Sequence, residues 1–138
     1  MQITDLIPHR PPFLFVDEII EADADHLLAR RTWRADEVFY AGHYPGNPIT
    51  PGVLLCEATF QAAAAFLASR GDEFGGKTPV LSRIQDARFK RMVKPGDTVD
   101  IEVRLKETLK GFHFLTGTVK ADGKVVVRLD FALALVDE

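Results

Sequence analysis

Cysteine is nearly absent from this 138-residue sequence, because Cys56 is its single example. One cysteine excludes an intramolecular disulfide, so packing rather than cross-linking must hold the fold. Cys56 lies in an apolar stretch where a small buried residue is the usual interpretation. This cysteine usage is typical of a reducing compartment, and we therefore expect a cytoplasmic protein.

Positive charge is not in excess, since 17 Lys and Arg face 20 Asp and Glu, for a net charge of −3. General affinity for nucleic acid or for an anionic membrane is therefore not expected. Long apolar runs are also lacking, because Glu57, Thr59 and Gln61 interrupt the longest one. We expect no signal peptide and no membrane span. Without repeats, and with 46% hydrophobic residues, the chain is predicted to form one domain over residues 1–138.

The first two thirds of the chain predict a strand pair and a helix. Residues 13–21 and 27–34 are rich in apolar and β-branched side chains and flank a polar turn, which indicates two strands. Residues 53–69 contain no proline or glycine and many helix formers, which predicts a helix of about five turns. That helix is apolar nearly all round, so the rest of the protein should enclose it.

The last third predicts antiparallel sheet. TVDIEVRLK alternates strictly between apolar and charged residues, and VVVRLDFALAL repeats the alternation. FHFLTGTVKA lies between them, bounded by Lys110-Gly111 and by the hairpin signal Asp122-Gly123. The helix is followed by a predicted meander of about four strands, so we predict an α+β fold in which an antiparallel sheet curls around one central helix.

Glu57 is unusual because it is a carboxylate within the apolar helix. Positions 53, 54, 60 and 61 hold no Lys or Arg, which excludes an ion pair one turn away on the same helix. Gln61, one turn on, shares its face and is positioned to hold it by a hydrogen bond. The residues alone leave two interpretations: a desolvated general acid that retains its proton, or a structural Glu bonded to backbone or to a neighbouring subunit.

His43 lies in AGHYPGNPITPG, a loop with three glycines and three prolines in twelve residues. Such a loop holds a side chain in one direction, and histidine exchanges protons near neutral pH. A turn histidine bonded to local backbone is the alternative interpretation. Pro51 and Gly52 stand at the helix start, where free N–H groups favour a developing negative oxygen. Base, acid and oxyanion donor would support proton removal next to a carbonyl and loss of a β-hydroxyl as water.

Three ordered motifs resemble the FabZ-type family of β-hydroxyacyl–acyl carrier protein dehydratases. GHYPGNPITPGVLLCEATFQ is similar to the family's GHFPGxPxMPGVLxxEAxxQ. LIPHRPPFLFVDEI is similar to its opening L-PHRxPFLLVDRV, and ARFKRMVKPGDTV is similar to its ARFKRPVxPGDxL. The resemblance extends across nearly the whole chain.

The resemblance implies a hotdog fold, homodimers joined sheet to sheet, and in many members trimers of dimers. It implies active sites at the dimer interface, with the histidine from one subunit and the glutamate from the other. On this mapping His43 removes the C2 proton, Glu57 protonates the departing hydroxyl, the Gly52 N–H binds the thioester carbonyl, and Gln61 orients Glu57. No metal or organic cofactor is implied. The pathway would be fatty acid biosynthesis or a related acyl or polyketide route.

Four positions depart from the family pattern. Tyr44 replaces the usual Phe, Thr50 the usual Met, Phe60 a usual Ala, and Met92 a proline. None removes a proposed catalytic group, but we expect Thr50 and Phe60 to reshape the acyl tunnel. Isomerising relatives usually carry Asp where this chain has Glu57, so we expect dehydration alone.

A local basic cluster in the third motif consists of Arg88, Lys90, Arg91 and Lys94. We predict that it docks an acidic acyl carrier protein bearing the substrate, the alternative being a solvated strand edge. His9 is interpreted as structural, and His26 and His113 receive no role. Two other functions fit the same residues: a hotdog thioesterase in which Glu57 activates water, and a non-catalytic acyl binder or structural partner of another dehydratase.

Overall fold

The computed structural model describes residues 2–71 and 77–137. Its elements are α1 (Ile3–Leu6), β1 (Glu18–Ala22), β2 (His26–Thr32), the 3-10 helix η1 (Val38–Ala41), α2 (Gly52–Ser69), β3 (Thr78–Phe89), β4 (Thr98–Leu109), β5 (Phe112–Ala121) and β6 (Lys124–Val136). The strands form one antiparallel six-stranded sheet in the order β1-β2-β4-β5-β6-β3.

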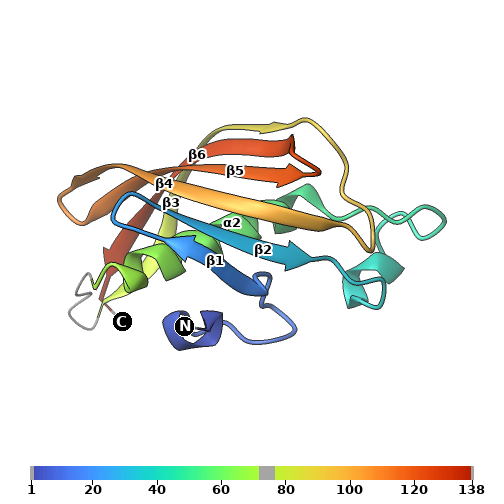
Figure 1. Ribbon diagram of the computed structural model, residues 1–138, viewed down its shortest axis with the longest axis horizontal. Coiled ribbons are helices and arrows are strands. Elements are labelled where there is room, and N and C mark those ends of the chain that lie inside the picture. The colour runs from blue at the N-terminus through green and yellow to red at the C-terminus, as the bar shows by residue number, and fades with distance from the viewer. Residues whose placement is uncertain (1, 72–76, 138) are drawn as a thin grey trace.

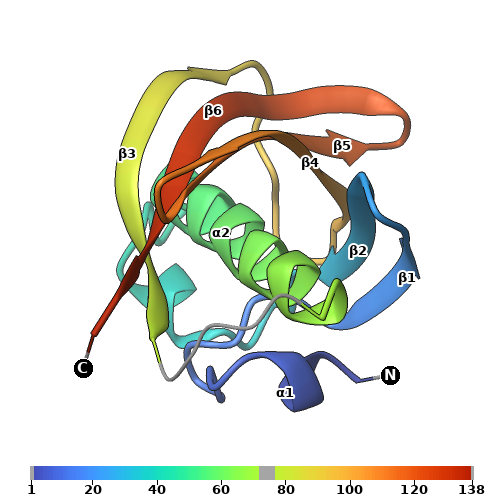
Figure 2. The same cartoon turned by 90° about the vertical axis from the view of Figure 1, so that its left-hand side faces the viewer.

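The sheet curls around α2, which runs through its concave side (Figure 2). Figure 1 shows the same helix behind β2 and β4, and in Figure 2 α1 lies on the side of α2 that the sheet leaves uncovered. This is the α+β hotdog architecture that the sequence predicts. The predicted helix over 53–69 is confirmed, with Gly52 as its first residue.

The burial of α2 explains its composition. Eleven of its residues are buried, among them Phe66 and Leu67 at 0% exposure. By length and composition alone α2 is able to cross a membrane, but 67% of the helix is buried inside the protein. Its apolar surface is therefore used for packing against the sheet, as in the core helix of a globular domain.

The strands follow the alternation that the sequence shows. On β4, Val99, Ile101 and Val103 are buried, and they point toward α2. The predicted hairpin turn between β5 and β6 is confirmed, since Asp122 and Gly123 have φ of 51° and 76°. A register shift near that turn leaves both Val126 and Val127 fully buried, so the strict alternation predicted for this strand is interrupted there.

Two details of the predicted topology are wrong. Residues 13–17 are not strand, and β1 begins only at Glu18, because backbone groups of Phe13 and Phe15 bond to the Gln61 side chain instead of to a strand. The strand after α2 also does not begin a continuous meander. β3 pairs with β6 at the sheet edge, while β4 pairs with β2 on its other side.

Gly117 marks the closest approach of the sheet to α2. A Cβ at this position would lie 2.3 Å from Thr59 Cγ2 on the helix. Gly117→Ala should therefore lower the free energy of unfolding by about 1–3 kcal/mol in urea titrations. Gly46→Ala is the matched control, because a Cβ there meets nothing within 4 Å. Equal stability of the two variants would show that the core accommodates the methyl group and that this contact does not limit packing.

Candidate active site

His43 is held by one backbone carbonyl of its own loop. The loop connects η1 to α2, and His43 is half-buried in it, with its Nδ1 2.9 Å from the Ile49 carbonyl oxygen. Because a carbonyl oxygen only accepts hydrogen bonds, Nδ1 carries the proton and donates it. Nε2 of the neutral ring therefore keeps its lone pair, which is the form that removes a proton.

Tyr44 follows His43 with φ of 56°, in the left-handed region. Its ring lies edge-on to the imidazole, with ring centroids 4.8 Å apart, and it is 64% exposed. The replacement of the usual Phe by Tyr thus adds a hydroxyl to an exposed side chain of the loop.

Glu57 is oriented by Gln61, as the sequence predicts. Gln61 Nε2 donates to Glu57 Oε2 at 3.0 Å and to the Phe13 carbonyl at 2.9 Å. The Gln61 Oε1 accepts from the Phe15 N–H at 2.8 Å. These contacts use both ends of a buried amide and fix which atom faces the carboxyl group. The Glu57 carboxyl group keeps one oxygen, Oε1, for another partner.

His9 also lies beside Glu57, which the sequence interpretation missed. His9 Nε2 is 3.8 Å from Glu57 Oε2, and His9 Nδ1 is buried without a hydrogen-bond partner among the described residues. Arg10 holds the turn by donating to the carbonyls of Ile7 and His9. The similarity of LIPHRPPFLFVDEI to the family's opening motif was the only sequence signal for this residue. Because 48 positions separate His9 from Glu57, no local pattern indicated their contact.

An apolar groove of about 480 Å³ begins at His9. It is lined by residues from the segment before the first strand, by Ala64 of α2 and by the start of β3: Leu6, Ile7, Pro8, His9, Ala64, Lys77, Thr78, Pro79 and Val80. A second groove, of about 530 Å³, lies at the C-terminal end of α2, near Ser69 and Arg70, and Leu6 lines both grooves. Of these two grooves, the first is the better candidate for a ligand, because it is lined by His9, whose side chain lies beside Glu57.

Gly52 places the first amide of α2 next to Phe89. A Cβ at Gly52 would lie 2.8 Å from Phe89 Cε1. Glycine at this position therefore permits the ring of Phe89, at the end of β3, to approach the start of α2. The Gly52 N–H belongs to the first turn of the helix, where no intrahelical carbonyl is available to it. Phe89 is 53% exposed.

Within the single chain the two halves of the predicted site remain separate. Glu57, Gln61 and His9 form one cluster, whereas His43 bonds to Ile49 in its own loop. Across residues 2–71 and 77–137, no hydrogen bond or ion pair joins His43 to Glu57.

Three of the sequence departures lie in different environments. Thr50 is buried and bonds to Tyr40, and Phe60 is buried against Phe131 with ring centroids 5.0 Å apart. Neither lines the apolar groove. Met92 is 69% exposed, on the segment between β3 and β4.

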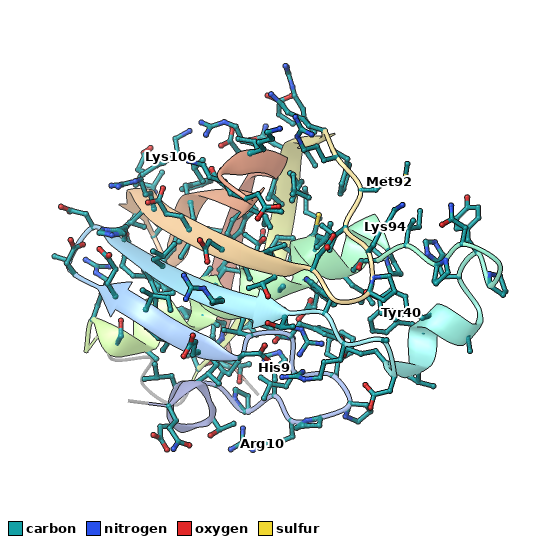
Figure 3. The ribbon with its side chains drawn as sticks, turned by 45° about the vertical axis from the view of Figure 1, so that its right-hand side comes forward. His9, Arg10, Tyr40, Met92, Lys94 and Lys106 are labelled. Atoms are coloured by element: carbon teal, nitrogen blue, oxygen red, sulfur yellow. The ribbon has the colours of Figure 1, made fainter. Side chains whose placement is uncertain are left out.

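The basic cluster is exposed on β3 and the segment that follows it. Arg88 is partly neutralised by Asp86, with Nε 3.0 Å from the carboxylate oxygen. Arg128 of β6 lies opposite Arg88 in the sheet and adds a basic residue that the motif did not include. The Val93 carbonyl accepts from the Thr50 N–H at 2.7 Å, so this basic segment passes directly beside the His43 loop. Figure 3 shows Lys94 and Tyr40 at this end of the molecule.

Cys56 precedes Glu57 on α2 but does not offer a nucleophile. It is buried, and burial raises the pKa of the Cys56 thiol, so the thiol stays protonated. Among the residues that the structure describes, no three His, Cys, Asp or Glu side chains are grouped as a metal site requires.

Comparisons with known proteins agree on one family. The model of the FabA-like domain family matches residues 7–130. A 3-hydroxyacyl-acyl-carrier-protein dehydratase FabZ from Anaeromyxobacter dehalogenans (strain 2CP-C) is 41% identical over 98% of this chain and 88% of its own length. An enzyme of the same name from Pseudothermotoga lettingae is 42% identical over 91% of this chain and 87% of its own length.

Solved structures show the same fold at lower identity. The dehydratase heterocomplex ApeI:P from Xenorhabdus doucetiae has a chain that superposes with a TM-score of 0.84 at 18% identity, covering 100% of this chain and 93% of that one. The E. coli PaaI protein has a TM-score of 0.67 at 18% identity, covering 84% of this chain and 80% of that one. These likenesses support the fold alone.

Proposed function

The chain belongs to the FabA-like domain family and is a FabZ-type 3-hydroxyacyl–acyl carrier protein dehydratase of fatty acid biosynthesis, and we propose that His43 and Glu57 are its catalytic pair. The substrate is a 3-hydroxyacyl thioester on acyl carrier protein, and the product is the trans-2-enoyl thioester and water. The observation that carries the residue assignment is the hydrogen bond from His43 Nδ1 to Ile49, because it leaves Nε2 free to act as a base.

The reaction is a balanced elimination between these two groups. His43 Nε2 takes the C2 proton while the electrons of that bond form the C2–C3 double bond. The C3–O bond breaks, and Glu57 gives its proton to the leaving hydroxyl, which departs as water. Transfer of the proton from the imidazolium to the carboxylate then restores the starting state, so no external oxidant, reductant or base is required.

Gln61 supports proton donation by Glu57, and Gly52 supports the negative charge that develops on the thioester carbonyl. Gln61 Nε2 donates to Glu57 Oε2, so Oε1, the oxygen without that contact, is the one that faces the departing hydroxyl in this proposal. The Gly52 N–H, at the positive end of the α2 dipole, binds the thioester carbonyl, on which negative charge develops as the C2 proton leaves. The acyl chain occupies the apolar groove that starts at His9.

The working unit is a homodimer formed through β3. This strand is the outer edge of the sheet, and its exposed apolar residues are Val80, Leu81, Ile84 and Phe89, at 39–53% exposure. A long apolar edge strand pairs readily with a second copy. In such a dimer each single-domain chain contributes His43 to one site and Glu57 to the other, which accounts for their separation within one chain. We assign the protein to the cytoplasm, where its single buried thiol remains reduced.

The acyl carrier protein docks on the basic cluster beside the His43 loop. Lys90, Arg91 and Lys94 are exposed, and the backbone bond between Val93 and Thr50 places them next to the loop that holds the base. An acidic carrier is attracted to this surface, and its phosphopantetheine arm enters near Gly52.

Removing either catalytic group should abolish most turnover while preserving the fold. His43→Ala and Glu57→Gln are each expected to lower kcat by about 100-fold or more, because each removes one proton-transfer group. This rate is measured as hydration of a short enoyl thioester, monitored by the loss of enoyl absorbance. His26→Ala, in the β1–β2 hairpin, and Glu107→Gln, exposed on β4, should retain the wild-type rate. Near-normal turnover in either catalytic variant refutes its assignment, and release of free thiol without enoyl chemistry indicates a thioesterase.

Charge reversal in the basic cluster should weaken carrier recognition selectively. Lys90→Glu with Arg91→Glu is expected to raise KM for a carrier-bound substrate by about tenfold or more, because steering of the acidic carrier is lost. KM for the same acyl group on N-acetylcysteamine should not change. Lys120→Glu, an exposed reversal on β5, is the matched control. Equal KM values for the carrier-bound substrate in both variants would place the docking surface elsewhere.

A further inference from the structure

The loop that carries His43 is open to solvent at its tip and closed at its base by two buried hydroxyl groups. Residues 44–47 are exposed, whereas Tyr40 and Thr50, at the two ends of the loop, are 5% and 4% exposed. The Tyr40 hydroxyl oxygen lies 2.5 Å from Thr50 Oγ1. One of the two hydroxyls therefore donates to the other in a buried part of the structure.

The peptide unit between Ile49 and Thr50 connects this pair to His43. Its carbonyl accepts from His43 Nδ1 at 2.9 Å, and its N–H donates to the Val93 carbonyl at 2.7 Å. The Ile49–Thr50 peptide unit is planar, and it is trans, because the cis bond among the described residues is Pro11-Pro12. In a trans unit the carbonyl and the N–H point in opposite directions. One rigid plane thus sets the direction of the imidazole relative to the Val93 segment.

The Thr50 side chain extends from the end of that plane, and Tyr40 holds it from a rigid support. Tyr40 belongs to η1, and its N–H donates to the Glu37 carbonyl at 3.2 Å. Glu37 in turn forms a close ion pair with the buried Arg31 of β2. The hydroxyl pair therefore ties the plane that orients His43 to the sheet itself.

We propose that Tyr40 and Thr50 are positioning residues for His43, acting through the orientation of the Ile49 carbonyl. The proposal rests on the proposed role of His43 as the base. The FabZ-type motif has Met at the position of Thr50, a residue without a hydroxyl group, so this clamp is a feature of the present chain rather than of the motif.

Loss of one hydroxyl should impair the chemical step more than substrate binding. Thr50→Val keeps the shape of the side chain, and Tyr40→Phe keeps its ring. Each is expected to lower kcat by about tenfold or more, since misplacement of a catalytic group is costly, with KM changed by no more than about twofold. Thr50→Ser retains the hydroxyl and should keep most of the rate.

The ¹⁵N NMR signals of the His43 ring provide a readout that loss of stability alone does not move. In the wild-type protein they should report a neutral ring protonated at Nδ1, and in both variants they should move toward a mixture of the two tautomers. His43→Ala identifies these signals among the four histidines. Thr32→Val is the matched control, because it removes another hydroxyl pair, with Thr98 at 2.8 Å, on β2 and β4. It should change neither the signals nor kcat.

The double variant Tyr40→Phe/Thr50→Val separates positioning from folding. It leaves no buried hydroxyl without a partner, so its melting temperature should be closer to that of the wild-type protein than either single variant's. Its kcat should nevertheless stay low. Wild-type kcat and unchanged His43 signals in the folded double variant overturn the clamp. If His43→Ala itself remains active, the proposed base fails instead, and the two failures are distinguishable.

Discussion

The burial of α2 inside the curled sheet is the constraint on which the rest of the structure depends. The helix is apolar on nearly every side, so it requires a sheet that surrounds it, and close contact at Gly117 fixes how near the two layers lie. Because Glu57 and Gln61 are on this helix and Gly52 begins it, the same packing fixes the proposed acid, its orienting amide and the proposed oxyanion donor together. The cost of placing polar groups on such a helix is offset by hydrogen bonds: Gln61 satisfies backbone groups of Phe13 and Phe15 as well as Glu57.

The acid and the base are held by different physical means. Glu57 is on a core helix, and its partners come from segments that pack around that helix. His43 is on an exposed loop whose direction is set by a few hydrogen bonds at its base, above all the one to Ile49. On the proposed assignment each chain presents half a site at each of two places, and we propose the edge strand β3, with its exposed apolar residues, as the surface through which a second copy completes both.

Local sequence patterns predicted much of the fold because they report local causes. The unbroken apolar run over 53–69 predicted the enclosed helix, and Asp122-Gly123 predicted a turn whose two residues do have positive φ. The glutamine one turn after Glu57 predicted a contact that the structure contains.

Features that depend on distant partners were missed. The position of β3 beside β6, the approach of His9 to Glu57 and the addition of Arg128 to the basic cluster all join residues far apart in sequence. Residues 13–17 looked like a strand because their composition is suitable, but the Gln61 side chain takes the backbone groups that a neighbouring strand would need.

The most direct test of a shared catalytic pair is the activity of mixed dimers. Chains carrying His43→Ala and chains carrying Glu57→Gln, each inactive alone, are produced together with different tags and the mixed dimer is isolated through both tags. If each site takes its base from one copy and its acid from the other, one site contains both substitutions and the other is intact, so the mixed dimer should show about half of the wild-type turnover. A mixed dimer as inactive as its parents, or the absence of any mixed dimer, would contradict the account.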